Sequence, residues 1–98
     1  MIDKTTVEQH ARTHGEAVVA GDLRTAGSSL TKDARDQAGA VMGALPKTLE
    51  AATVESVDEA DEGLVARIKY TGEGREVVVE SLWEDRDGEP KIAALRVV

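Results

Sequence analysis

The spacing of hydrophobic residues changes once along this chain of 98 residues, close to Pro46. Before Pro46 they recur every three or four residues, which is typical of amphipathic helices. From Leu49 they alternate with polar residues, as in strands that bury one face. This order predicts an α+β domain in which N-terminal helices pack on one face of a curved, antiparallel four-stranded sheet, a cystatin-like cone. We expect residues 1–98 to form a single domain, since the chain is too short for two cores.

Three helices are predicted before Pro46. The first covers "TTVEQHARTHGEAVVAGD", where Thr5 and Glu8 match a capping box and Gly21 ends the pattern. Its buried stripe would consist of Val7, Ala11, His14 and Val18.

The second and third helices are shorter. Asp22 fits the N-cap of a short helix, and another is expected to begin near Thr31 or Asp33 and to end before Pro46. The buried side of this third helix would carry Ala34, Ala38, Val41, Met42 and Leu45.

Four strands are predicted over residues 49–59, 63–71, 75–85 and 91–98. Glu73-Gly74 and Asp87-Gly88 fit two-residue hairpin turns, and such turns fix the pairing register. The predicted pairs on the core face are Tyr70 with Val77, Ile68 with Val79, Ala66 with Ser81, Leu64 with Trp83, Trp83 with Ile92, Ser81 with Ala94, and Val79 with Arg96.

The opposite face of the predicted sheet is half apolar. It pairs Arg67 with Glu80 and Glu84 with Lys91. It also carries Val65, Val78, Leu82, Ala93, Leu95 and Val97. The helices can cover only one face, so we expect a homodimer formed through this outer face.

Charge and composition exclude several classes of function. The formal charge of −7, without a cluster of Lys or Arg, argues against nucleic acid and anionic membranes as partners. The absence of Cys removes disulfides, thiolate metal ligands and thiol catalysis. No segment reads as a signal peptide or a membrane span, so a cytoplasmic, acidic protein is expected.

A few polar residues on the core face are candidates for chemistry. His14 shares the buried stripe of the first helix, where an imidazole can accept a proton near neutral pH, or simply bond a backbone carbonyl. Arg96 either extends to solvent or holds a carboxylate or phosphate in a pocket. Tyr70 and Trp83 belong to the core face, and Trp83 is expected to pack beneath the first helix. His10 precedes His14 by one turn, but no third ligand stands at a motif spacing, so no metal or other cofactor is expected.

The predicted core face also has a row of small residues, Ala66, Ser81 and Ala94. Something else must occupy the space above them. Two occupants are open: a helix that approaches closely through Gly39 or Gly43, or a small ligand.

The N-terminal helix ending in "AVVAGD", the two helices after it and the closing "SLWEDRDGEPKIAALRVV" together resemble the nuclear transport factor two-like, or SnoaL-like, superfamily. The resemblance implies a conical pocket between helices and sheet and dimers through the sheet. It also implies that enzymes of this kind use a pocket carboxylate as base. This chain is shorter, and no Asp or Glu falls on the derived core face.

The favoured interpretation is therefore a small dimeric domain that binds an apolar or acidic ligand through His14, Tyr70, Ser81, Trp83 and Arg96, without a catalytic residue. One alternative is an isomerase or hydrolase with His14 as base and Tyr70 or Arg96 as electrophile. Another is a protein–protein interaction module that uses the acidic surface.

Overall fold

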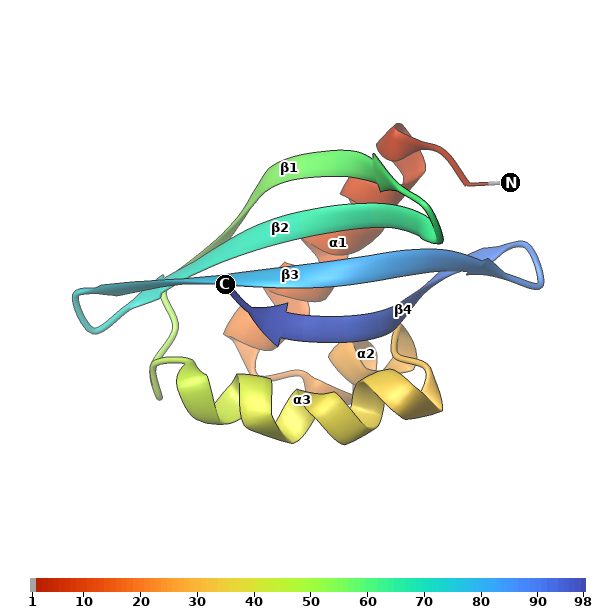
Figure 1. Cartoon of the computed structure of the whole chain (residues 1–98). Helices are drawn as coiled ribbons and strands as arrows, with labels where there is room; N and C mark the ends of the chain where they lie inside the picture. The colour runs from red at the N-terminus through yellow and green to blue at the C-terminus, as the bar shows by residue number, and fades with distance from the viewer. Residues whose placement is uncertain (1) are drawn as a thin grey trace.

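The computed structural model describes residues 2–98 and confirms the α+β fold (Figure 1). Its helices are α1 (Lys4–Ala20), α2 (Leu23–Ser28) and α3 (Lys32–Ala44). Its strands are β1 (Ala51–Ala60), β2 (Gly63–Gly72), β3 (Arg75–Arg86) and β4 (Glu89–Val97). The strands form one antiparallel sheet in the order β1-β2-β3-β4. No helix within residues 2–98 has the length and apolar character needed to cross a bilayer.

The helices begin and end at residues with ordinary capping chemistry. The N-cap of α1 is Asp3, whose side chain accepts a hydrogen bond from the Thr6 N–H at 2.8 Å, so the predicted capping box at Thr5 is wrong. Gly21 ends α1 in the left-handed region with φ 75°, as predicted. Asp22 and Thr31 cap α2 and α3.

The β2–β3 hairpin has the predicted register. Glu73 and Gly74 have φ values of 54° and 74°, as a two-residue turn of type I′ requires. Ala66 is therefore opposite Ser81, and Leu64 is opposite Trp83.

The β3–β4 hairpin departs from the predicted register. Its turn is as predicted and Trp83 is opposite Ile92, but Leu82 is opposite Ala94, so Ala93 is the extra residue of a β-bulge. Because one residue of shift exchanges the two faces of a strand, Ala94 and Arg96 lie on the outer face. The predicted pairs of Ser81 with Ala94 and of Val79 with Arg96 are thus wrong.

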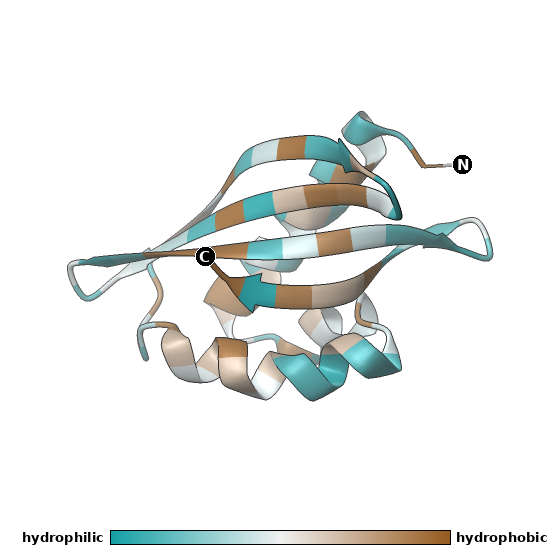
Figure 2. Ribbon diagram, in the orientation of Figure 1, coloured by the Kyte–Doolittle hydropathy of each residue, from teal (hydrophilic) through white to brown (hydrophobic). Residues whose placement is uncertain are grey.

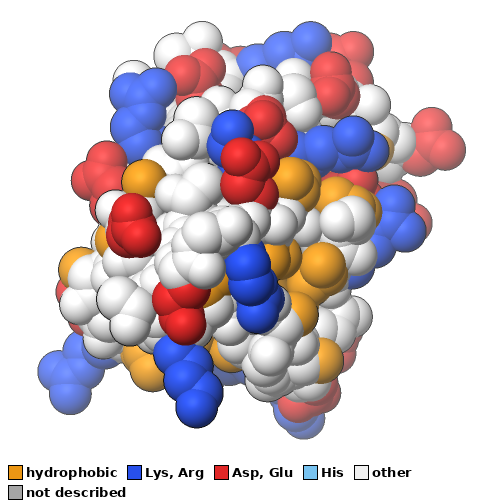
Figure 3. Space-filling model, turned by 90° about the vertical axis from the view of Figure 1, so that its left-hand side faces the viewer, with side chains coloured by type: hydrophobic (Ala, Val, Ile, Leu, Met, Phe, Trp, Pro, Cys, Tyr) orange, Lys and Arg blue, Asp and Glu red, His pale blue; other side chains and the backbone are white. Residues whose placement is uncertain are grey.

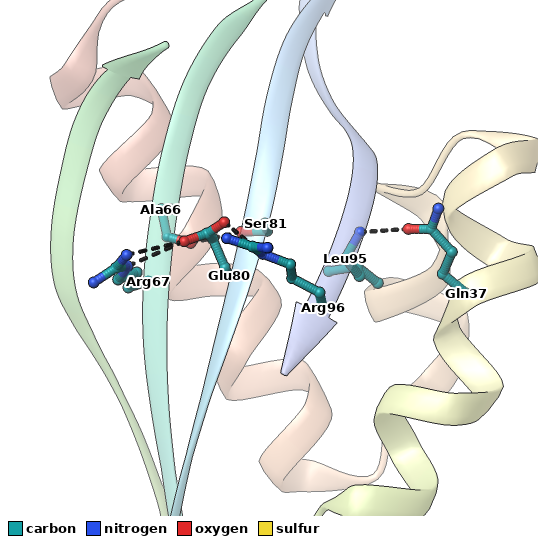
Figure 4. A network of polar contacts seen from close by, with 7 residues as sticks. All are labelled: Gln37, Ala66, Arg67, Glu80, Ser81, Leu95 and Arg96. Carbon is teal, nitrogen blue, oxygen red and sulfur yellow. Dashed lines mark hydrogen bonds and ion pairs between the residues drawn. The ribbon is translucent and has the colours of Figure 1, made fainter. Parts of the chain in front are cut away.

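Two helices cover different parts of the sheet. Helix α1 crosses the inner face over β1 and β2, whereas α3 runs along the free edge of β4 (Figure 1). The Ile92 N–H donates to Ser29 O at 2.7 Å, and the Ile92 carbonyl accepts from the Thr31 N–H at 2.9 Å. The Leu95 N–H donates to the Gln37 side chain at 2.7 Å (Figure 4). The edge of β4 is therefore covered, and α3 is held beside the sheet instead of upon it.

Hydrophobic and hydrophilic residues alternate along the strands (Figure 2). The inward set packs against buried residues of α1 such as Val7, Ala11 and Val18. The core is made almost entirely of aliphatic side chains, with Trp83 as its largest member.

Candidate functional site

The part of the inner face beneath α1 is closely packed. A Cβ built on Gly15 would lie 3.0 Å from the Cβ of Ala52 and 3.5 Å from Ile68, so the absent side chain is what brings the helix onto the sheet. A helix therefore approaches closely through Gly15, over Ala52 and Ile68, which do not belong to the predicted row of small residues; that row is itself broken, because Ala94 lies on the outer face. Gly39 and Gly43, the predicted positions, have open space where a Cβ would be.

Trp83 and Ser81 complete this closed region and are hydrogen-bonded to each other. The Trp83 Nε1–H donates to the Ser81 hydroxyl at 2.9 Å, and that hydroxyl donates to Ala66 O at 3.1 Å. The rings of His10 and His14 stand edge-on to Trp83, with centroids 6.3 and 6.4 Å away. Trp83 therefore packs under the first helix, as expected, and its polar atom is already occupied.

Beside this region the helices and the sheet border a partly open cavity of about 220 Å³. It lies between α1 and α2 on one side and α3 on the other, above Val79 and Leu95 of the sheet. Its described lining contains no Asp, Glu, Lys or Arg. The cavity exists because α3 is tied to the edge of β4 and leaves the space next to α1 unfilled.

His14 is one of two residues with a polar side chain in the cavity wall. Its Nδ1–H donates to the Ala26 carbonyl at 3.1 Å, because a carbonyl oxygen can only accept, and Nε2 is left as an acceptor. Burial lowers the pKa of His14, and the bond to Ala26 only partly opposes this effect. The ring is consequently neutral at physiological pH.

Tyr70 is the other. Its side chain is 2% exposed, and burial raises the pKa of its hydroxyl far above the ordinary value, so it is a neutral donor. Within residues 2–98 the hydroxyl has no hydrogen-bond partner. Among the described residues, every side-chain nitrogen or oxygen that is fully buried has a hydrogen-bond partner. Because the Tyr70 hydroxyl has none, its oxygen is not fully buried.

Arg96 is not part of this site. Its Nε–H donates to Glu80 at 2.9 Å on the outer face, its side chain is 70% exposed, and Arg67 holds the same carboxylate from the other side at 3.1 Å (Figure 4). The hydrogen bond from Arg96 is the largest influence that lowers the pKa of Glu80. The prediction of a pocket cation at Arg96 is therefore wrong.

The structure thus brings together two of the five predicted residues, His14 and Tyr70. Ser81 and Trp83 are on the inner face but outside the cavity wall, which instead contains Leu23, Met42 and Leu95. The prediction that Met42 lies on the buried side of the third helix is wrong, since Met42 is 42% exposed, and the 60% exposure of Leu23 was not predicted. No group of three metal-binding side chains occurs among residues 2–98.

Comparison with known proteins gives no relative: no family model, no curated protein and no solved structure matches this chain.

Proposed function

We propose that this protein binds a small, largely apolar molecule in the cavity between its helices and its sheet. The observation that carries the proposal is a cavity without charged residues in its described wall, to which His14 and Tyr70 both contribute. An apolar space with one or two fixed polar groups is the usual composition of a small-molecule site. In this proposal the Tyr70 hydroxyl donates to the ligand and Nε2 of His14 offers an acceptor.

The same wall favours binding over catalysis. General acid–base chemistry needs a group whose pKa is near the working pH and a second group of opposite role. His14 has a lowered pKa and no carboxylate partner, and the hydroxyl of Tyr70 is a poor acid. The isomerase or hydrolase alternative therefore has less support than binding.

Thermal stabilisation by small apolar molecules tests the proposal. A cavity of about 150 Å³ accepts benzene, so this one is large enough for a single ring such as toluene or indole. We expect such ligands to raise the melting temperature of the wild type. Gly39→Leu should abolish the rise, since Gly39 lines the cavity and its side-chain position is open.

The matched control is Gly43→Leu, on the same helix but outside the cavity wall. It should leave binding of one-ring ligands unchanged. If no apolar molecule binds, or if Gly39→Leu binds as well as the wild type, the proposal is rejected.

We also propose that the protein is a homodimer through the outer face of its sheet. A shallow hollow of about 510 Å³ lies on this face, with Val65, Leu82 and Ala94 in its apolar part. The bulge puts Leu95 opposite Ser81 and Val97 opposite Val79, so neither residue has the predicted outer-face register, although Leu95 still borders the hollow. The patch is thus smaller than the sequence predicted.

Charge supports a second copy as the occupant of this hollow. Arg67 and Arg96 share the single acid Glu80 on one side, which leaves that side positive, while Asp61 and Glu62 line the other side. A twofold axis through the apolar centre places the acids of each copy on the arginines of the other.

Light scattering at micromolar concentration tests this interface. Leu82→Lys should give monomers, whereas Thr13→Lys on the exposed side of α1 should not change the mass. A wild-type monomer would reject the dimer.

A further inference from the structure

A second hollow of about 440 Å³ lies on the surface between the ends of α1 and α3. Its walls are mostly apolar, and four of its residues also line the inner cavity: Val18, Leu23, Met42 and Leu45. The two hollows therefore adjoin each other at these four residues. We call this second hollow the outer groove.

Leu23 and Met42 are unusual for residues at such a boundary. Their exposed fractions are 60% and 42%, and within residues 2–98 the other exposed large hydrophobic residues are Val97 and Val98 near the C-terminal end of the chain. Met is the most adaptable of the apolar side chains, since it is unbranched and rotates freely. A chain-like molecule passing between Leu23 and Met42 would bury both.

One charged residue lines the outer groove, and it is Lys47. Among residues 2–98 its ammonium group has no hydrogen bond and no ion-pair partner. Nearby, Arg75 donates to Ala44 O at 3.0 Å, and the Glu73 carboxylate accepts from Thr48 N–H at 3.1 Å. Figure 3 faces this end of the molecule and shows hydrophobic side chains between charged ones of both signs.

We propose that the cavity and the outer groove together bind an unbranched fatty acid, with its hydrocarbon tail in the cavity and its carboxylate at Lys47. The assignment rests on the proposed binding function and names its ligand class. It follows from three features: an inner wall without charge, a boundary of exposed Leu23 and Met42, and one unpaired cation at the outer end. The carboxylate stays near solvent, where its desolvation is small.

The volume sets the length of the tail. A cavity of about 150 Å³ accepts the six carbons of benzene, so in proportion the cavity of about 220 Å³ holds about eight or nine carbons. A few more carbons are needed to pass Leu23 and Met42. A chain of about ten to twelve carbons is therefore expected.

The test compares decanoate, decanol, butanoate and toluene by calorimetry, with the methyl signal of Met42 as a structural probe. The chain contains only one other methionine, Met1, so the signal is readily assigned. Decanoate should bind at least about tenfold more tightly than butanoate, because each buried methylene strengthens binding. It should also shift the Met42 signal.

Lys47→Gln should weaken the binding of decanoate by about two- to fivefold, as for the loss of a solvent-exposed ion pair, and should leave the affinity for decanol unchanged. Lys32→Gln, at the start of α3 and away from both hollows, is the matched control and should change neither ligand. Added salt should reduce the contribution of Lys47.

The outcomes separate this inference from the binding function. Toluene binding without decanoate binding, or a Lys47→Gln variant that binds decanoate as the wild type does, overturns the fatty-acid assignment and leaves the cavity proposal standing. If the Met42 signal shifts with protein concentration and not with added ligand, a second copy of the protein covers Leu23 and Met42, and the fatty-acid assignment is also overturned. If none of the four ligands binds, both proposals fail.

Discussion

The inner face of the sheet has two halves that are built by opposite means. Under α1 the helix touches the strands through Gly15, and Trp83 and Ser81 fill the remaining space and bond each other. Between α1 and α3 the helices do not fill the space above the strands and a cavity remains, although Val79 on its sheet side is only 3% exposed. The closed half holds the molecule together, and the open half is available to a ligand.

Glycine shows the difference most clearly. At Gly15 the missing side chain permits a contact that any larger residue would obstruct, whereas Gly39 has nothing within 4 Å of its side-chain position. The same residue type thus closes one half and leaves the other open. Packing density, and not residue type, distinguishes the two halves.

Removing the centre of the closed half should have the largest effect. Trp83→Ala is expected to lower the free energy of unfolding by about 3–5 kcal/mol, since Trp83 is fully buried and loses both its packing and its bond to Ser81. Leu23→Ala in the open half should cost less than about 1 kcal/mol, because Leu23 is 60% exposed. Urea denaturation measures both, and similar losses would contradict the division into halves.

The same substitution made in both halves should act in opposite directions. Gly15→Leu should destabilise by about 1–3 kcal/mol because Ala52 and Ile68 leave no room. Gly39→Leu should be neutral or stabilise by up to about 1 kcal/mol, since it adds a good helix former within α3 and meets no neighbour. Equal destabilisation by both variants in thermal denaturation would show that the open half is packed after all.

His14 stands at the boundary of the two halves and makes stability depend on pH. Its pKa is lowered in the folded state by burial, so below the ordinary value of 6.5 the unfolded chain binds the proton more readily. This contribution to stability is therefore present above pH 6.5 and is lost as the pH falls. His14→Gln should flatten the loss of stability between pH 7 and 5.5. Identical pH profiles for wild type and His14→Gln would contradict this assignment.

The two hairpins show how far the fold could be predicted. Both turns are recognisable from Asp or Glu followed by Gly, and the β2–β3 register follows from its turn over the whole strand. In β3–β4 the turn fixes only the pairs up to Trp83 and Ile92, because no glycine marks the bulge at Ala93. One signal was present: the bulged register puts Arg96 opposite Glu80, whereas the regular register puts it opposite Val79.

The cavity was harder to predict than the sheet. His14 and Tyr70 could be placed on the inner face from helical and strand spacing alone. Whether α3 lies on the sheet or along its edge depends on contacts between distant segments, such as Gln37 with Leu95, which no local pattern encodes. The exposure of Met42 follows from that placement and was therefore unpredictable from its helix.

The smallest expected effect concerns Arg96, which the bulge moves away from the inner face. In the Leu82→Lys background, where the proposed dimer does not form, Arg96→Ala should cost at most about 1 kcal/mol of stability, because its side chain is 70% exposed. The pKa of Glu80 should rise in the variant, since the hydrogen bond from Arg96 is the main cause of its lowering. In the wild type, the stabilisation that comes from this lowered pKa is present at neutral pH and is lost as the pH falls through the pKa of the folded state. Carboxyl NMR titration measures that shift, and ligand affinity in the cavity should stay the same. A variant that loses ligand affinity while Glu80 titrates as in the wild type would return Arg96 to the inner face and refute the bulged register.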